Sequence, residues 1–334
     1  MNDAAPWLRA QSLSLLSQQG HAWLLQGPSG LGQYELASAL VSAWLCESVN
    51  AKIEGACGQC GSCHALSVHT HADLFVLMPE TILLELGWPL SEKAQSEIDN
   101  KTRKPSKEIR IEAMRDAIEF SQRTNARGRG KAVLVFPAER MNHVTANALL
   151  KTLEEPPGDV KFVLATEAAH QLLPTIRSRC QTHTMTWPAE SEAVAWLVSQ
   201  GLSQNDAPLL LKTAGGRPDE VLRQLQQGQT LQWWSQLPKA MLMGNASHCA
   251  DLPASEVIDA LQKLCHDLVM LQSQAPLRYF NATDLPRLKT SQVQLTAWFK
   301  RLAQAAKTSE HPFNAGLMLE ALCTEAREVM NSSA

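Results

Sequence analysis

Short apolar runs alternate with helix-like patterns along the first half of the chain. These runs lack the alternation of apolar and polar residues that marks a strand with one wet face, so they predict strands covered by helices on both faces. Residues 33–45 predict a helix with Leu36, Leu40 and Trp44 along one side. Strands separated by helices predict an α/β fold with a mostly parallel sheet. The predicted strands are 21–26, 74–77, 132–136 and 161–165.

The pattern changes after Trp187 and Pro188, where the strand-like runs end. Apolar residues then recur at helical spacing, and Pro253 and Pro286 separate the longer segments. We therefore expect an α/β domain followed by all-helical material. The predicted helices of this second half are 190–199, 207–213, 220–226, 255–274 and 291–307.

Residues 78–105 form a longer connection than the elements of a compact domain usually need. The connection ends in the basic run 101–105, but Glu92, Glu97 and Asp99 dilute that charge. Two interpretations stay open. A solvated insertion is favoured by the interleaved acids, and a basic loop that contacts DNA is the alternative.

Composition and charge narrow the class of protein. The 334 residues are 45% apolar and 19% charged, which excludes a disordered or fibrous chain. The net charge of -3 gives no overall positive field toward nucleic acid. The chain start lacks a basic leader and the longest apolar run, 36–46, is too short to cross a bilayer, so we expect a soluble, cytoplasmic protein with no membrane partner.

Six basic residues are interleaved with acids and are interpreted as a solvated helix face: Arg110, Arg115, Arg123, Arg127, Arg129 and Lys131.

Four of the eight cysteines crowd into one segment. Each C-x2-C step lets two thiolates reach one ion from a tight turn, and Gly58 and Gly61 relax the backbone that wraps the sulfurs. Four thiolates fill a tetrahedral site, which predicts a structural Zn²⁺ with no open position for catalysis. An iron–sulfur cluster and unrelated free thiols are the alternatives, and His64 is interpreted as a neighbour of the site. The predicted ligands are Cys46, Cys57, Cys60 and Cys63.

A glycine-rich segment between a predicted strand and a predicted helix, residues 27–32, has the context of a phosphate-binding loop. Its glycines are Gly27, Gly30 and Gly32. The complete motif continues with a lysine for the β- and γ-phosphates and a Ser or Thr for magnesium. Gln33 and Tyr34 stand at these two positions, and neither supplies that chemistry. The sequence predicts a loop shape without its phosphate-binding side chains.

The end of the third predicted strand shows a second loss. An ATPase of this plan carries acidic residues there, for magnesium and for the attacking water. Here the chain reads Phe136-Pro137-Ala138-Glu139, and Glu139 is displaced into the following turn, where it is interpreted as a surface carboxylate. Two losses at one site predict that this chain neither binds ATP productively nor hydrolyses it.

Several segments together resemble the delta-prime subunit family of the bacterial DNA polymerase III clamp loader, within the AAA+ ATPase group. The run 146–157 is shared with the ATP-hydrolysing gamma/tau subunits, and loss of the phosphate-loop lysine separates the two kinds of subunit. The matching motifs span roughly residues 7–180. They are the loop 27–32, the four clustered cysteines, the run 146–157 and the run 176–180.

The resemblance implies a three-part architecture. An AAA+ α/β domain over 1–187, with a parallel sheet, a degenerate P-loop and the zinc module at 46–63, precedes a small helical lid domain over 188–240. A C-terminal all-helical collar domain over 241–334 joins the oligomer. Thr166 stands at the phosphate-sensing position of the wider ATPase group and is interpreted as vestigial.

The resemblance also implies a role for Arg179 of the Ser-Arg-Cys motif. A lone arginine in a surface turn is ordinarily a solvated side chain, whereas in this family it looks like an arginine finger that reaches ATP on a neighbouring gamma/tau subunit. The expected function is that of a non-hydrolysing accessory subunit, no enzyme on its own. It contacts the gamma/tau and delta subunits, and meets the sliding clamp and primed DNA through the assembly during replication.

Two other functions stay open from the sequence. One is an ATP-hydrolysing subunit of the gamma/tau type, which would require nucleotide binding despite Gln33 and Tyr34. The other is a zinc-dependent nucleic-acid-binding protein, which the sequence pI near 6.4 disfavours.

Overall fold

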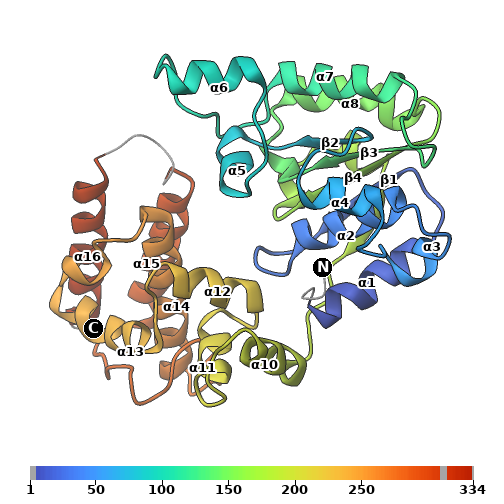
Figure 1. The fold of residues 1–334 in the computed structure, drawn as a ribbon. Helices are drawn as coiled ribbons and strands as arrows, with labels where there is room; N and C mark the ends of the chain where they lie inside the picture. The colour runs from blue at the N-terminus through green and yellow to red at the C-terminus, as the bar shows by residue number, and fades with distance from the viewer. Residues whose placement is uncertain (1–4, 309–313, 333–334) are drawn as a thin grey trace. The chain divides into compact units, whose positions relative to one another are not determined.

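The computed structural model describes residues 5–308 and 314–332 (Figure 1). The chain divides into two compact units, Met1–Trp187 and Pro188–Ala334. The first unit contains the sheet, and the described part of the second is helical. Each unit has its own hydrophobic core.

The first unit is built on one five-stranded parallel sheet, in the order β2-β3-β4-β1-β5. Leu24 of β1 lies opposite Leu164 of β4, and Leu25 lies opposite His183 of β5. The predicted α/β class and its four apolar strands are confirmed. The strands are β1 (Ala22–Gln26), β2 (Leu74–Leu77), β3 (Lys131–Val135), β4 (Val160–Thr166) and β5 (Gln181–Thr184).

Strand β5 was not predicted, and its sequence explains why. It reads Gln-Thr-His-Thr, lies at the edge of the sheet and is mostly exposed. An edge strand pairs through its backbone on one side only, so it needs no apolar run. Strand β5 forms because it pairs with β1, and this pairing cannot be read from the local sequence of residues 181–184.

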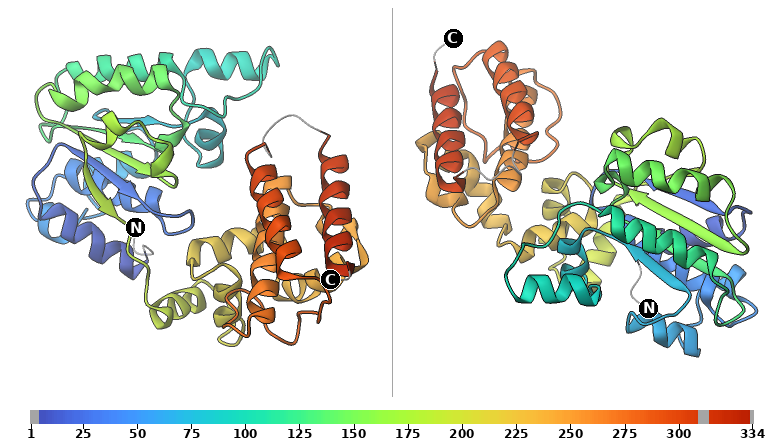
Figure 2. Two further views of the ribbon diagram at one scale, coloured as in Figure 1. Left: turned by 180° about the vertical axis from the view of Figure 1, so that it is seen from behind. Right: turned by 90° about the horizontal axis from the view of Figure 1, so that it is seen from above.

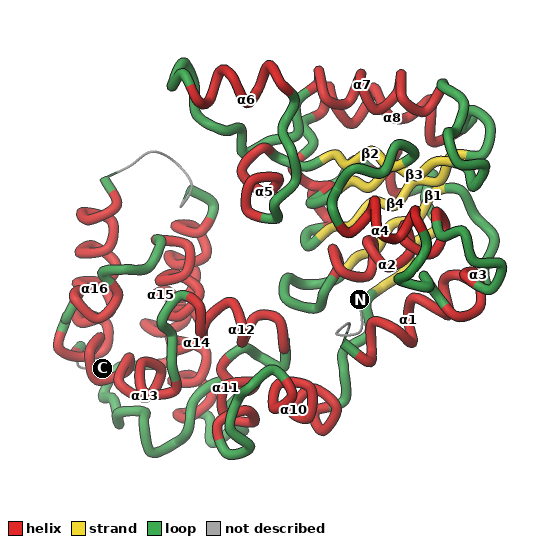
Figure 3. The backbone as a smooth tube through the Cα atoms, in the orientation of Figure 1, coloured by secondary structure: helices red, strands yellow, loops and turns green. Residues whose placement is uncertain are grey.

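Helices cover both faces of the sheet (Figures 2 and 3). In Figure 1, α7 and α8 lie on one face, and α2 lies on the other with α1 and α4 beyond it. The apolar side chains of α7 and α8 pack with Val133 and Phe162 of the sheet in one buried cluster. The helices are α1 (Pro6–Leu16), α2 (Gln33–Leu45), α3 (Ala51–Glu54), α4 (Gly61–Ser67), α5 (Glu80–Glu85), α6 (Glu92–Asp99), α7 (Ile111–Gln122), α8 (His143–Glu154) and α9 (Pro174–Arg177), with 3-10 turns η1 (Ala138–Arg140) and η2 (Ala169–Gln171).

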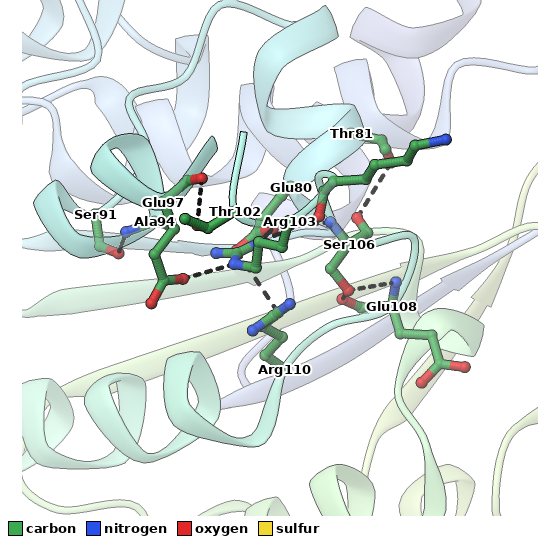
Figure 4. A network of polar contacts seen from close by, with 11 residues as sticks. Glu80, Thr81, Ser91, Ala94, Glu97, Thr102, Arg103, Ser106, Glu108 and Arg110 are labelled. Atoms are coloured by element: carbon green, nitrogen blue, oxygen red, sulfur yellow. Dashed lines mark hydrogen bonds and ion pairs between the residues drawn. The ribbon is translucent and has the colours of Figure 1, made fainter. Parts of the chain in front are cut away.

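The connection 78–105 is an insertion that folds into two helices, which were not predicted. It contains α5 and α6, and a polar network holds them together (Figure 4). Arg103 donates to Glu80 at 2.5 Å and to Glu97 at 2.6 Å, and Glu80 also accepts the backbone N–H of Ser106 at 2.8 Å. The arginine of the basic run is therefore engaged by carboxylates of its own segment, which weighs against the DNA-contacting alternative.

The basic stretch 110–131 also differs from its predicted solvated helix face. Arg115 lies exposed on α7 as expected, but Lys131 belongs to β3 and is buried, with its ammonium over the Phe120 ring. Arg127 and Arg129 follow α7 and bind Glu47. Alternating charge along the sequence does not distinguish a helix face from a loop bound to a neighbouring segment.

The second unit is a helical assembly around one continuous hydrophobic cluster. Trp234, Trp298 and Leu264 are fully buried in it, and Trp233 packs against it partly buried. The cluster runs from Ala193 to Met330 without a break at residue 240, so the division into lid and collar stays a proposal. Its helices are α10 (Glu190–Ser199), α11 (Asp206–Thr213), α12 (Pro218–Gln226), α13 (Leu231–Met243), α14 (Ala254–Gln272), α15 (Gln292–Ala306) and α16 (Ala315–Asn331), with the 3-10 turn η3 (Ala246–Cys249). Within the described ranges, no helix has the length and apolar character to span a membrane.

Candidate functional site: a closed glycine loop, a cysteine module and an exposed arginine

The glycine loop, residues 27–32, lies at the carboxyl end of β1 and leads into α2. Gly30 and Gly32 have φ of 82° and 84°, a left-handed conformation that favours glycine. At Gly27 an added Cβ would lie 2.9 Å from the Cβ of Met185, so a larger residue does not fit. The predicted loop shape between strand and helix is therefore present.

The side chain of Gln33 fills the position next to this loop. Its amide nitrogen donates to the carbonyl oxygens of Gly27 at 2.8 Å and of Pro28 at 2.7 Å, and the residue is 2% exposed. A buried amide with two acceptors is well satisfied. Gln33 thus ties the two ends of the loop together with the chain's own groups.

Tyr34, the next residue, is engaged by the insertion. Its hydroxyl oxygen accepts a hydrogen bond from the indole N–H of Trp88 at 2.8 Å. The Trp88 ring stacks on His69 with 3.8 Å between ring centroids, and the Tyr34 ring lies 5.6 Å from that of Phe136 at the end of β3. The insertion and the end of β3 therefore both contact Tyr34.

Glu139 is not the surface carboxylate that the sequence suggested. It is half-buried, accepts the Thr166 hydroxyl at 2.7 Å and accepts the backbone N–H of Glu167 at 3.1 Å. Thr166 is fully buried. The carboxyl ends of β3 and β4 thus bring together the acidic and the polar residue of the predicted site, and the two groups satisfy each other.

Arg179 lies in the turn between α9 and β5, partly exposed. Ile176 before it is buried, and Cys180 after it packs partly against the same core, so the turn is fixed on both sides. Burial raises the pKa of the Cys180 thiol to about 12. The guanidinium of Arg179 donates through Nε to Glu154 at 2.6 Å and through Nη1 to the Thr175 carbonyl at 2.9 Å.

The four predicted cysteines form one group, and we call residues 46–63 the cysteine module. Their sulfur atoms all lie within 4.8 Å of one another, and three of the sulfur–sulfur distances are 3.8 to 3.9 Å. A tetrahedral ion with bonds of about 2.3 Å to sulfur requires edges of about 3.8 Å. The donor set therefore fits a single metal ion. His64 is exposed and outside the group, in agreement with its predicted role as a neighbour.

Backbone N–H groups surround these sulfurs. Cys46 Sγ accepts from Ser48 and Cys57, and Cys60 Sγ accepts from Cys63, each at 3.4 Å. Hydrogen bonds from the backbone N–H groups of Gln59 and Cys60 lower the pKa of Cys57 to about 6, whereas burial raises the pKa of Cys46 and of Cys63. The positive charge of an ion would favour the thiolate form at all four positions.

Glu47 connects the cysteine module to the rest of the unit. Its carboxylate accepts the Ser62 backbone N–H at 3.1 Å, the Ser62 hydroxyl at 2.9 Å and Arg127 at 2.9 Å. Sequence reasoning missed Glu47 and Trp88. An isolated tryptophan between Gly87 and Pro89 in a polar stretch was an available signal for Trp88, but Glu47 gave none.

A family model described as DNA polymerase III, delta subunit, matches residues 11–188. The match covers more than half of the chain and includes the glycine loop, the cysteine module and Arg179. The chain belongs to this family.

Relatives agree with that membership. DNA polymerase III subunit delta' of Pseudomonas aeruginosa is 37% identical over 223 residues, 65% of this chain and 60% of that protein. The Escherichia coli subunit delta' is 34% identical over 223 residues, 65% and 59% of the two chains. The Escherichia coli subunit tau is 34% identical over 160 residues, 48% and 20%. The chain spans about three fifths of the length of the delta' relatives, and the predicted resemblance to delta-prime subunits is confirmed.

In this member of the DNA polymerase III subunit family, the three candidate regions differ in the groups that they present. The glycine loop, Glu139 and Thr166 gather at the carboxyl edge of the sheet and bond among themselves. The cysteine module presents a ligand set, and Arg179 presents a cation on a fixed turn. These are the features on which a function can be based.

Proposed function

We propose that the chain is a non-hydrolysing, delta-prime-type subunit of the DNA polymerase III clamp loader. It organises one end of the assembly and supplies Arg179 in trans to ATP bound by a neighbouring gamma/tau subunit. The observation that carries the proposal is the pair of hydrogen bonds from Gln33 to the loop carbonyls. A loop closed by its own amide, beside a Tyr34 engaged by Trp88, has no side chain to place on a phosphate or on magnesium.

The role of Arg179 is supported by its position. A finger has to be exposed, charged and held by a rigid base, because its contribution comes from positive charge placed at the transferring phosphoryl group. Arg179 is partly exposed and carries the charge, and its turn is anchored because the buried Ile176 lies in α9 directly before it. In the proposed assembly, the ATP that Arg179 serves would be bound by the neighbouring gamma/tau subunit.

We further propose that the ion of the cysteine module is a structural Zn²⁺. Four thiolates leave no open position for a substrate or a water, and the sulfur spacing leaves room for one ion only. An iron–sulfur cluster needs a wider arrangement, because several irons and sulfides have to fit between the thiolates. Zinc would supply folding energy to the module and no catalysis.

We also propose the larger architecture that the resemblance to this family implies. The first unit would be the AAA+ domain, and the helical unit would hold the lid over 188–240 and the collar over 241–334. The partners would be the gamma/tau and delta subunits, with the sliding clamp and primed DNA reached through the assembly. The cytoplasmic location likewise stays a prediction.

The test is an exchange of Arg179 in the reconstituted clamp loader. Arg179→Ala should lower turnover at the neighbouring ATP site by roughly 10³-fold or more, because fingers contribute that much in NTPases. Arg177→Ala is the matched control, since Arg177 is an exposed arginine two residues away in the same turn of chain and should leave turnover unchanged. Assembly that persists with unchanged DNA-dependent ATPase in the Arg179→Ala complex contradicts the proposal.

A direct titration separates this function from that of an ATP-hydrolysing subunit. Labelled Mg·ATP added to the isolated chain should show no saturable binding, because Gln33 and Tyr34 hold the two positions that would contact phosphate and metal. Saturable binding, lost again in a Gln33→Ala variant, would favour the gamma/tau-type alternative.

A further inference from the structure

The guanidinium of Arg179 is held along one edge by a residue of another helix. Nε donates to Oε1 of Glu154 at 2.6 Å, and Nη2 donates to the same carboxylate. Nη1 donates to the carbonyl oxygen of Thr175, four residues earlier, at 2.9 Å. The Glu154 side chain is 48% exposed and that of Arg179 is 28% exposed, so the pair lies at the surface with the arginine more covered.

The number of N–H groups on the Arg179 guanidinium determines how many remain available for another ligand. A guanidinium has five N–H donors in a rigid plane. The contacts to Glu154 and Thr175 engage three of them, one on each nitrogen. The two that remain belong to the terminal nitrogens, one to each. That arrangement is the fork that binds two phosphate oxygens at once.

The backbone beneath the pair is fixed on both sides. Glu154 is the last residue of α8, and the preceding Leu153 is buried in the core of the first unit. Ile176, at the start of the turn that carries Arg179, is buried in the same cluster. Two anchored elements therefore meet at one ion pair, and the pair determines where a long, otherwise flexible side chain points.

We propose that Glu154 is a positioning residue for Arg179. It binds the Nε edge and so aims the outer edge of the guanidinium at a phosphate presented by the neighbouring subunit. This inference rests on the proposed role of Arg179 in trans. Glu154 touches no reacting atom itself, and it acts by removing rotamers in which the fork points elsewhere.

The sign of the effect separates positioning from competition. A carboxylate that merely competed with phosphate for Arg179 would slow the reaction, so its removal would raise turnover. A positioning carboxylate gives the opposite result. Because orientation matters most in the transition state, loss of Glu154 should lower kcat and change KM for ATP little.

The experiment uses the reconstituted clamp loader with Glu154→Ala, Glu154→Gln and the control Glu155→Ala, whose exposed carboxylate is the next residue. We expect Glu154→Ala to lower kcat at the neighbouring site roughly 10-fold, with KM for ATP within about twofold. Glu154→Gln keeps the shape and one acceptor oxygen, so it should lie between Glu154→Ala and the unmodified chain. Glu155→Ala should not differ from the unmodified chain.

A double-mutant cycle makes the test specific. In an Arg179→Ala background, Glu154→Ala should have no further effect, because Glu154 acts only through Arg179. An equal effect in both backgrounds, a rise in turnover, or an unchanged turnover in Glu154→Ala overturns the inference while the finger itself stands. If Arg179→Ala alone leaves turnover unchanged, the proposed function fails, and the inference fails with it.

Discussion

The cysteine module and the glycine loop lie in the same unit, but they have different parts of a binding site: the module has the side chains, and the loop has the backbone shape. The module has its complete set of ligand side chains, gathered within 4.8 Å. The loop has the backbone of a phosphate site, with Gly30 and Gly32 in left-handed conformations, but the side chain of Gln33 next to it bonds to the loop's own carbonyl groups. The two regions therefore differ in their side chains, because those of the module form a ligand set whereas Gln33 bonds to the loop.

The two regions also differ in what holds them together. Buried residues at the centre of the module amount to Cys46, Ala51 and Cys63, too small a core to fold by itself. The glycine loop instead is closed by Gln33 and is linked through Tyr34 and Trp88 to the insertion. The comparison predicts that the module depends on an ion and that the loop region depends on nothing outside the chain.

Removal of the ion from the cysteine module should have the largest effect, because the module depends on it and the glycine loop does not. Cys63→Ser takes a buried thiolate from the ligand set, and the zinc content should fall from about one ion per chain to near none. The module should then unfold locally, because apparent binding free energies of structural zinc are about 10–16 kcal/mol. Elemental analysis measures the metal, and hydrogen exchange at the α4 amides measures the folding.

Cys180→Ser is the control for this prediction. Its sulfur is half-buried but lies outside the cluster, so zinc content and α4 protection should stay unchanged. A chelator that strips the metal should reproduce the Cys63→Ser result. Full protection of the α4 amides from exchange after complete removal of the metal would contradict this prediction. The module would then stay folded without an ion, as the glycine loop does.

A smaller effect is expected within the insertion itself, where Glu80 holds Arg103 and Ser106. Glu80 is nearly buried and accepts bonds from Arg103 and Ser106, so Glu80→Gln leaves a partly buried guanidinium with a weaker partner. We expect a loss of about 2 kcal/mol in the free energy of unfolding, measured by urea denaturation. The exposed Glu92→Gln in α6 is the control and should cost little.

The same network gives a pH dependence with a definite sign. Burial alone would raise the pKa of Glu80, but the bonds from Arg103 and Ser106 and the charge of Arg110 lower it overall. A carboxylate with a lowered pKa stabilises the fold above its ordinary range and loses that contribution as the pH falls. Protection of the insertion amides should therefore decrease below about pH 4, and less so in Glu80→Gln, which has no charge to lose.

The sequence predicted those parts whose signals are local. Strands β1 to β4 are apolar runs, and the cysteine ligands lie within one segment, so pattern and spacing were sufficient. Contacts between distant residues were out of reach: Arg103 meets Glu80 across 23 positions, and Trp88 meets Tyr34 across 54. No periodicity marks such pairs. For the same reason the helices of the insertion were not predicted, and Glu139 was interpreted as a surface carboxylate.

The smallest predicted effect tests the link between insertion and loop directly. Trp88→Phe keeps an aromatic ring against His69 but removes the N–H that Tyr34 accepts. Both residues are partly exposed and water can replace the bond, so the loss should be about 1 kcal/mol or less. Trp187→Phe, at an exposed tryptophan, is the matched control. In a Tyr34→Phe background Trp88→Phe should cost nothing more, because the acceptor is already gone. An undiminished cost there would mean that the indole stabilises the insertion by packing alone, and that the glycine loop is closed by Gln33 without help from the insertion.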